Sequence, residues 1–231
     1  MNHIAANLAG VHRRLQAACA RAGRPSGGVR LVAVTKGFGA AAVAAAVAAG
    51  QREFGESYVQ EAVPKMQALG AGPPLAWHFI GPVQSNKTRD IAAHFQWVHG
   101  VDRLKIGERL SVQRQEPEPL DVCVQVNISG EISKSGCTPA DAPDLCAKLA
   151  RLPGIRLRGL MAIPAAGSGP ESARPAFRRM RALFEAIGQG GAVDPRLFDT
   201  LSMGMSADIE VAIEEGATLV RVGTAIFGSR E

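Results

Sequence analysis

Lys36 lies where a lysine can act as a nucleophile. It directly follows the run Arg30 to Thr35, which is rich in Val and Leu, as is typical of a strand buried on both faces of a parallel sheet. A Lys at the mouth of such a sheet is partly desolvated, which lowers its pKa, and a neutral amine can form a Schiff base with an aldehyde. The alternative is a rim cation in a salt bridge. The chain has 20 Arg and only six Lys, so a rim cation is expected to be Arg, which forms no Schiff base.

Two glycine-containing segments near the C-terminus could bind an anion. Ser202, Met203 and Gly204 follow one predicted strand, and Gly223 and Thr224 follow the next. Each segment offers a hydroxyl and backbone N–H groups, and each runs into helical residues whose N-terminus favours an anion. The glycines could instead only make tight turns. Their occurrence as a pair after the last two strands favours a phosphate site, because the barrel inferred below uses these two loops for phosphate.

Arg221 lies inside the last apolar run, between Val220 and Val222. Alternation of side chains along a strand places Arg221 on the same face as Gly223, so both face the ligand or neither does. A fixed guanidinium there can donate to a pyridine nitrogen and keep it unprotonated. It could instead neutralise a carboxylate inside the barrel. An amine that captures aldehydes, placed opposite a phosphate site, suggests pyridoxal 5′-phosphate as the cofactor.

Short β-rich runs alternate with helical stretches along the whole chain, and these elements must position the residues above. The expected strands are 30–35, 53–55, 77–80, 96–101, 120–127, 157–162, 198–202 and 219–222. The expected helices between them are 40–49, 57–69, 85–94, 102–114, 139–150, 171–188 and 206–215. Eight such units in 231 residues predict parallel strands with right-handed crossovers in a (β/α)8 barrel. A doubly wound open sheet is the alternative, but no G-x-G-x-x-G follows the first strand.

An additional helix is expected before the first strand, over residues 3–22, because apolar residues recur at helical spacing from Ile4 to Leu15. This helix could take the place of the helix that is curtailed after the eighth strand. The prediction is therefore an α/β fold, a single modified (β/α)8 TIM barrel domain over residues 1–231 with an extra N-terminal helix.

Composition excludes several classes of protein. Hydrophobic residues make up 46% and charged residues 20% of the chain, which is typical of a folded globular protein. We find no apolar run of the roughly 20 residues that a membrane helix needs, and no secretion signal. The four cysteines form no C-x-x-C pair and no His lies at zinc-finger spacing, which predicts a reduced, cytoplasmic protein without a metal site. The net charge of +5 comes without a basic and aromatic motif, so no nucleic acid partner is expected.

Seven runs of the sequence resemble the pyridoxal-phosphate homeostasis protein family, the stand-alone relatives of the N-terminal barrel of alanine racemase. They are VAVTKGF (32–38), FGESYVQE (54–61), WHFIGPVQSNK (77–87), SKSG (133–136), LRGLMAI (157–163), LSMGMSAD (201–208) and VRVGTAIFG (220–228). These runs are spread over essentially the whole chain. One position departs from the family, which usually reads FGENYVQE. Ser57 replaces that Asn, and its shorter reach would require a bridging water for a cofactor contact.

The resemblance implies a modified barrel that holds pyridoxal 5′-phosphate as an aldimine to Lys36. It assigns the phosphate to the segments after the last two strands and the pyridine nitrogen to Arg221. It implies no catalytic and no metal-ligating residue. The candidate cofactor-binding residues are Lys36, Ser57, His78, Met161, Ser202, Met203, Gly204, Arg221, Gly223 and Thr224.

Two functions remain open. The first is cofactor homeostasis, in which a monomeric, non-catalytic carrier buffers pyridoxal phosphate or delivers it to apo-enzymes. The second is an amino-acid racemase, which needs a base on each face of the cofactor. In alanine racemase a Tyr from a further domain is the second base, whereas this chain has one Tyr, Tyr58, and no room for such a domain. His78 could be proposed instead, but a structural role is more typical of a buried His. Lys87 and Lys134 stay open as a second docking point for the cofactor.

Overall fold

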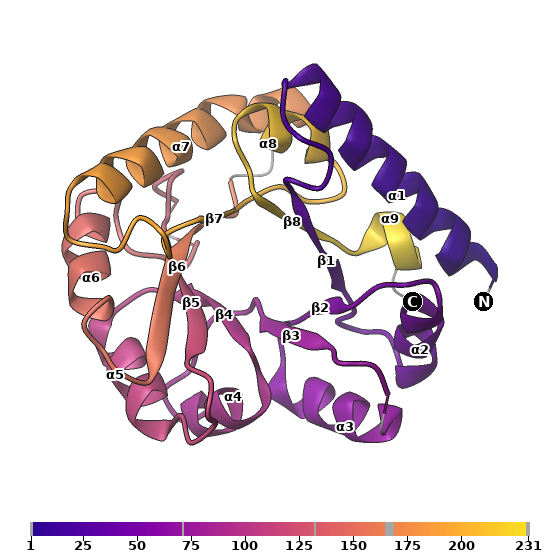
Figure 1. Ribbon diagram of the computed structural model, residues 1–231, viewed down its shortest axis with the longest axis horizontal. Helices are drawn as coiled ribbons and strands as arrows, with labels where there is room; N and C mark the ends of the chain where they lie inside the picture. The colour runs from indigo at the N-terminus through magenta and orange to yellow at the C-terminus, as the bar shows by residue number, and fades with distance from the viewer. Residues whose placement is uncertain (1, 71, 132, 165–168, 230–231) are drawn as a thin grey trace.

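Parallel strands close on themselves in the computed structural model, which describes residues 2–70, 72–131, 133–164 and 169–229 (Figure 1). Within these residues eight strands follow one another around the barrel in chain order, and the last pairs with the first. The strands are β1 (Arg30–Val34), β2 (Glu53–Glu56), β3 (Ala76–Phe79), β4 (Trp97–Val101), β5 (Leu120–Gln125), β6 (Ile155–Met161), β7 (Thr200–Ser202) and β8 (Leu219–Val222). The predicted barrel is confirmed, and the open-sheet alternative is wrong.

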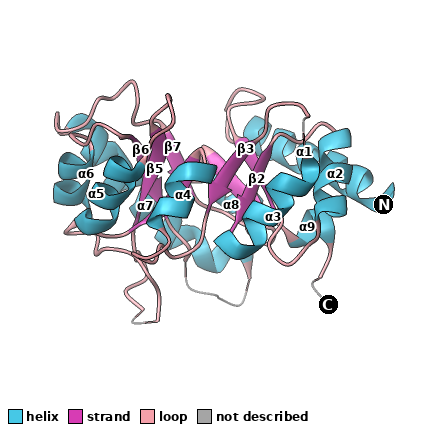
Figure 2. Ribbon diagram, turned by 90° about the horizontal axis from the view of Figure 1, so that it is seen from below, coloured by secondary structure: helices cyan, strands magenta, loops and turns pink. Residues whose placement is uncertain are grey.

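Helices surround the strands on the outside of the barrel (Figures 1 and 2). They are α2 (Ala40–Ala48), α3 (Val59–Leu69), α4 (Thr88–His94), α5 (Leu104–Gln113), α6 (Ala142–Leu149), α7 (Arg174–Gln189), α8 (Ile209–Glu214) and α9 (Thr224–Phe227), with a 3-10 turn, η1 (Pro170–Ala173), before α7. The main core lies between strands and helices, where outward-facing residues such as Phe54, Val98 and Leu160 are fully buried. The opposite faces of the strands carry a separate apolar cluster of Trp97, Cys123 and Met161 inside the barrel.

The N-terminal helix α1 (Asn2–Arg21) completes the ring of helices beside α8, α9 and α2 (Figure 1). Its apolar face is buried from Ile4 to Leu15, and on its polar face Arg14 pairs with Glu210 of α8 at 2.7 Å. The helix after β8 is only four residues long. The longer α1 therefore takes much of the outer position that α9 leaves open, as the sequence predicts.

Several predicted element ends are wrong by a few residues. The helix predicted over 85–94 begins only at Thr88, because the Thr88 hydroxyl donates to the Ser85 carbonyl across a turn. The strand predicted to begin at residue 157 begins at Ile155, which pairs with β5. Conversely, Phe198 precedes β7, because its N–H closes a turn onto the Asp194 carbonyl.

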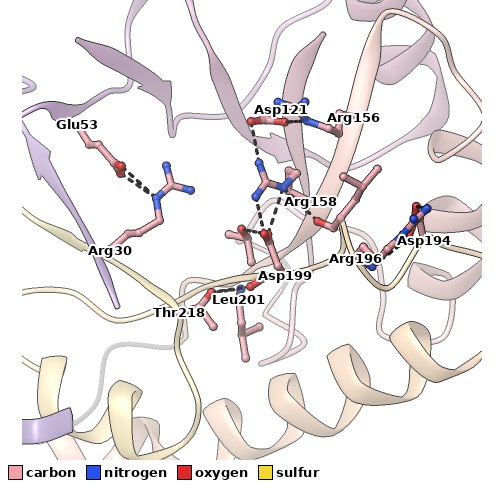
Figure 3. Close-up of polar contacts among 12 residues, drawn as sticks. Arg30, Glu53, Asp121, Arg156, Arg158, Asp194, Arg196, Asp199, Leu201 and Thr218 are labelled. Atoms are coloured by element: carbon pink, nitrogen blue, oxygen red, sulfur yellow. Dashed lines mark hydrogen bonds and ion pairs between the residues drawn. The ribbon is translucent and has the colours of Figure 1, made fainter. Parts of the chain in front are cut away.

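Charged side chains close the end of the barrel at which the strands begin (Figure 3). Asp121 pairs with Arg156 and with Arg158, and Arg158 also pairs with Asp199. The guanidinium groups of Arg30 and Arg158 lie over the ring of Trp97, at 4.5 and 4.9 Å from its centroid. These cation–π contacts and ion pairs cover the Trp97 ring at this end of the barrel.

A bulge in β6 brings Arg158 into this cluster. The β5–β6 register shifts between Val122 and Cys123, because Leu157 opposes Val122 but Gly159 opposes Cys123. The extra residue keeps Arg158 and Gly159 both on the inner side. Gly159 has a φ of 153°, and a Cβ there would overlap the Thr200 carbonyl of β7. Glycine at this position therefore permits the close approach of β6 and β7.

Candidate functional site

A tight turn holds Lys36 at the carboxyl end of β1. The N–H of Phe38 donates to the Thr35 carbonyl at 3.0 Å, so Lys36 is the second residue of a four-residue turn. Gly37, the third residue, has a φ of 79°, which favours glycine because an L side chain would be strained there. Lys36 itself is half-buried. The sequence thus ends the strand with a lysine on a fixed turn at the mouth of the barrel.

A buried ion pair fixes Thr35, the residue before Lys36. The Lys65 ammonium of α3 donates to the Thr35 carbonyl at 2.8 Å and to Glu56 at 2.7 Å, and the Thr35 hydroxyl donates to the same Glu56 oxygen at 2.6 Å. Glu56 ends β2 and is fully buried, and its second carboxylate oxygen has no partner in the described part of the chain. Burial raises the pKa of Glu56, and the hydrogen bonds from Lys65 and Thr35 oppose that rise.

A second carboxylate fixes Gly37, the residue after Lys36. Glu61, in the first turn of α3, accepts the Gly37 N–H at 3.0 Å and lies 3.8 Å from the Lys65 ammonium. Glu56 and Glu61 both lie in the run FGESYVQE, and neither was expected to support the site. The available signals were a Glu that ends an apolar strand and the four-residue spacing of Glu61 and Lys65 on one helix face.

Arg221 is buried inside the barrel, on the strand that pairs with β1. One guanidinium nitrogen donates to the Ser202 hydroxyl at 2.6 Å, and the other donates to the Ala162 carbonyl at 3.0 Å. Burial lowers the pKa of Arg221 to about 10, so the group is still protonated at neutral pH. A guanidinium has five N–H donors, and the contacts within the described residues occupy only part of that capacity. The Arg221 cation is therefore fixed in position, and N–H groups of its guanidinium remain available to a ligand.

The two predicted anion loops lie next to each other and next to the end of β1. The Arg221 N–H donates to the Gly204 carbonyl at 3.0 Å, which joins the β7 loop to β8. Gly223 lies so close to β1 that a Cβ would come within 3.3 Å of the Val34 carbonyl oxygen. The hydroxyl of Ser206, which sequence reasoning did not select, accepts the Ala225 N–H at 3.3 Å and so joins the loop after β7 to the start of α9.

The Ser202 hydroxyl and the Met203 N–H already make hydrogen bonds within the chain. The Ser202 hydroxyl contacts Arg221 and also lies 2.8 Å from His99 Nδ1. The Met203 N–H donates to the Leu219 carbonyl at 3.1 Å, and its side chain is fully buried. A phosphate contact from either residue stays a prediction. Thr224 is exposed, so its hydroxyl faces solvent at the start of α9.

His78 and Met161 lie inside the barrel. His78 is fully buried, stacks on Trp97 with ring centroids 5.4 Å apart, and bonds through Nδ1 to His99 Nε2 at 3.0 Å. Met161 is fully buried and packs in the interior cluster with Trp97 and Cys123. His99, which the sequence reasoning missed, is thus the residue that connects His78 to Ser202 and Arg221.

Ser57, Lys87 and Lys134 lie farther out on the loops. In the described part of the chain the Ser57 hydroxyl makes no side-chain hydrogen bond, and its backbone packs against Gly81. Ser57 and Lys87 line one pocket of about 200 Å³. Lys134 lies on the loop after β5, where its carbonyl accepts from the Asn127 amide. A cofactor contact from any of the three stays a prediction.

The cysteines and the acidic residues offer no competing chemistry among the described residues. Burial raises the pKa of the Cys123 thiol far above its ordinary value, and raises those of Cys137 and Cys146 to about 12. These thiols are therefore protonated at neutral pH. The described residues contain no cluster of three or more His, Cys, Asp or Glu that could hold a metal ion, and none of their helices is suited to cross a bilayer.

We expect acid to destabilise the fold through His78 and His99. Burial is the largest cause that depresses both pKa values; His99 and Arg30 add to it at His78, and Arg221 and Arg30 add to it at His99. Both imidazoles are neutral in the folded chain and take up protons in the unfolded chain as the pH falls below about 6.5. Each should therefore lower the free energy of unfolding by about 1.4 kcal/mol per pH unit below that value, until the folded protein is itself protonated.

The measurement is urea unfolding between pH 5 and 7. His99→Gln should remove about half of the histidine contribution to this pH dependence. His12→Gln, at an exposed position, should leave the pH dependence unchanged. An identical slope for wild type and His99→Gln would contradict a neutral, buried His99.

The comparison with known families first defines the class of barrel. The family described as alanine racemase, N-terminal domain, matches residues 6–231. An alanine racemase from Corynebacterium glutamicum has a TM-score of 0.71 at 18% identity, covering 99% of this chain and 61% of that chain. This likeness shows a shared fold. The chain is thus a barrel of the alanine racemase N-terminal class.

Closer relatives define the family. Proteins named pyridoxal phosphate homeostasis protein from Pseudomonas aeruginosa and Escherichia coli (strain K12) are 55% and 50% identical, covering 100% of this chain and 97% and 98% of theirs. The structure of PipY from Synechococcus elongatus PCC7942, with PLP bound, has a TM-score of 0.83 at 38% identity, covering 97% of this chain and 100% of that chain. The chain belongs to the pyridoxal phosphate homeostasis protein family. The predicted family is confirmed, and the names of these relatives lend no support to the racemase alternative.

Proposed function

We propose that this chain binds pyridoxal 5′-phosphate through Lys36 and takes part in the intracellular homeostasis of that cofactor. One observation carries the proposal: a lysine on a fixed turn ends β1, and a buried, held arginine lies on β8, the strand paired with it. The related PipY binds the same cofactor. A lysine can bind the aldehyde of this cofactor and an arginine can contact its pyridine nitrogen.

The residues of the barrel mouth fit this group. Bound pyridoxal phosphate supplies an aldehyde that amines attack. The Lys36 amine is suited to form the new C=N bond, with the aldehyde oxygen leaving as water. Arg221 presents a cationic donor to the ring nitrogen, and a cation there keeps that nitrogen unprotonated, which makes the ring a weak electron sink. The loops that hold Gly204, Gly223 and Thr224 present backbone and hydroxyl donors for the phosphate.

This arrangement favours storage over turnover. The buried carboxylate and ammonium groups next to Lys36 are used to hold its backbone, so they are poorly placed to act as bases. We therefore propose a monomeric cytoplasmic carrier that buffers the cofactor or delivers it to apo-enzymes, with no robust catalysis of its own.

A transfer experiment tests delivery. The chain loaded with pyridoxal phosphate is mixed with a cofactor-free aminotransferase, and the return of aminotransferase activity is followed. In parallel, the spontaneous release of cofactor is measured with a phosphatase that destroys free pyridoxal phosphate. Delivery predicts that activity returns faster than release alone allows. If activity returns only at the rate of spontaneous release, the chain acts as a buffer and the delivery role is contradicted. If the chain retains no cofactor on gel filtration, both the buffering and the delivery roles are contradicted.

A further inference from the structure

A continuous row of polar side chains crosses the inside of the barrel from Arg221 to Glu53. The Arg221 guanidinium donates to the Ser202 hydroxyl at 2.6 Å, and the same hydroxyl lies 2.8 Å from His99 Nδ1. His99 Nε2 lies 3.0 Å from His78 Nδ1, and His78 Nε2 lies 3.6 Å from the Glu53 carboxylate. The five residues come from five different strands, so the barrel fold alone brings them together.

One direction of hydrogen bonding satisfies the links from Arg221 to His78. The Ser202 hydroxyl accepts from Arg221, which has no acceptor atom, so it is free to donate its proton to His99 Nδ1. His99 is then protonated on Nε2 and donates to His78, and His78 in turn directs its Nε2 proton toward the Glu53 carboxylate.

The opposite direction is disfavoured at both ends of the row. If His99 Nδ1 carried the proton, the Ser202 hydroxyl would face two donors and would have no acceptor for its own proton among the described residues. The Nε2 lone pair of His78 would then face the Glu53 carboxylate at 3.6 Å and be repelled by its negative charge, whereas an Nε2 proton is attracted to it. An unsatisfied buried polar atom costs about 1–3 kcal/mol, so this direction is strongly disfavoured.

The surroundings also hold both imidazoles neutral and in place. The groups that face them are Arg30 and Arg221, whose charges oppose protonation, the carboxylate of Glu53, and the ring of Trp97. Glu53 is itself paired with Arg30 at 3.1 Å (Figure 3), so its charge is already balanced. Stacking on Trp97 fixes the plane of the His78 ring.

We propose that Ser202, His99 and His78 are positioning residues that hold the Arg221 guanidinium for the cofactor, through hydrogen bonds that all point from Arg221 to His78, with the Nε2 proton of His78 directed at Glu53. The row anchors Arg221 to the charged end of the barrel opposite the cofactor pocket. It keeps the Ser202 hydroxyl turned so that a lone pair meets Arg221. The effect on the cofactor rests on the proposed function, whereas the row is a property of the chain alone.

The first test needs no cofactor. Long-range proton–nitrogen NMR of the ¹⁵N-labelled chain at pH 7 reports which ring nitrogen of each His is protonated. The expected result is a neutral imidazole protonated on Nε2 at both His78 and His99. A proton on Nδ1 of His99, or a charged imidazolium at either residue, would overturn the proposal.

The second test measures how much the Ser202 hydroxyl contributes to positioning Arg221. Ser202→Ala should speed the release of pyridoxal phosphate by about tenfold and shift the visible absorption band, because a hydrogen bond to a charged group is lost. Ser111→Ala is the matched control, because it also removes a buried hydroxyl. The Ser111 hydroxyl lies on α5, outside the row, and accepts from the Gly154 N–H. Equal release and equal spectra for Ser202→Ala and wild type would refute the positioning role.

The two tests separate this proposal from the proposed function. A chain that shows the expected histidine protonation but binds no pyridoxal phosphate would overturn the function and leave the row intact. A chain that binds the cofactor normally while Ser202→Ala changes nothing would overturn the positioning role alone.

Discussion

Lys65→Met should lower the free energy of unfolding by about 3–5 kcal/mol, because it leaves the buried carboxylate of Glu56 without its cation. The Lys65 side chain is only 10% exposed and that of Glu56 is fully buried, so water cannot replace the lost partner. The Thr35 carbonyl loses its donor at the same time. Methionine keeps most of the length of the lysine side chain, so the change isolates charge and hydrogen bonding from packing.

The measurement is urea unfolding at neutral pH. Lys148→Met is the matched control, because Lys148 pairs with Asp144 four residues earlier on α6 and both side chains are largely exposed. An exposed pair of this kind contributes only about 0.3–0.5 kcal/mol. Adding Glu56→Gln to Lys65→Met should recover part of the loss, because the uncompensated charge is removed. If Lys65→Met and Lys148→Met lower the free energy of unfolding equally, the stabilising role of the buried Lys65–Glu56 ion pair is contradicted.

Lys36→Ala should weaken the binding of pyridoxal phosphate by about 100-fold or more, a free-energy difference of about 2.8 kcal/mol. The reason is that the proposed covalent bond to the amine is no longer available, while the proposed contacts from Arg221 and from the loops after β7 and β8 remain. Lys36→Arg should fail in the same way, since it keeps the charge but cannot form the C=N bond. Lys36 is half-buried, so neither change should cost much stability.

Equilibrium dialysis and the visible absorption of the bound cofactor give the readout. Lys105→Ala, at an exposed position on α5, is the control and should bind as wild type does. Retention of the visible band in Lys36→Ala would mean that another lysine holds the cofactor. Lys87 and Lys134 would then be the first to replace, because both lie on loops that follow strands of the barrel.

The barrel could be predicted from the sequence because local patterns determine its elements. Each strand is a short β-rich run followed by a helical stretch, and eight such units leave few topologies open. Lys36 and Arg221 could be selected for the same reason, since a strand end and a strand alternation place them without knowledge of any partner. The bulge at Gly159 could not be predicted, because it depends on the approach of β7 at Thr200.

The residues that support the site were harder to find, because their partners are distant in sequence. His99 lies 103 residues from Ser202 along the chain, and only barrel closure brings them to 2.8 Å. Lys65 is separated from Thr35 by 30 residues along the chain. The helical spacing of apolar residues does not distinguish Lys65 from other polar residues of its helix. Polar contacts between strands that are distant in sequence carry no local pattern, so no spacing rule could indicate them.

The most direct measurement is reduction of the cofactor-loaded chain with borohydride, followed by peptide mapping of the pyridoxyl group. Our account predicts a stoichiometric adduct on Lys36. It predicts the same single adduct in Lys105→Ala and none in Lys36→Ala. An adduct confined to another lysine in the wild-type chain, or none at all, would contradict the central claim that Lys36, on its fixed turn beside the held Arg221, binds the cofactor.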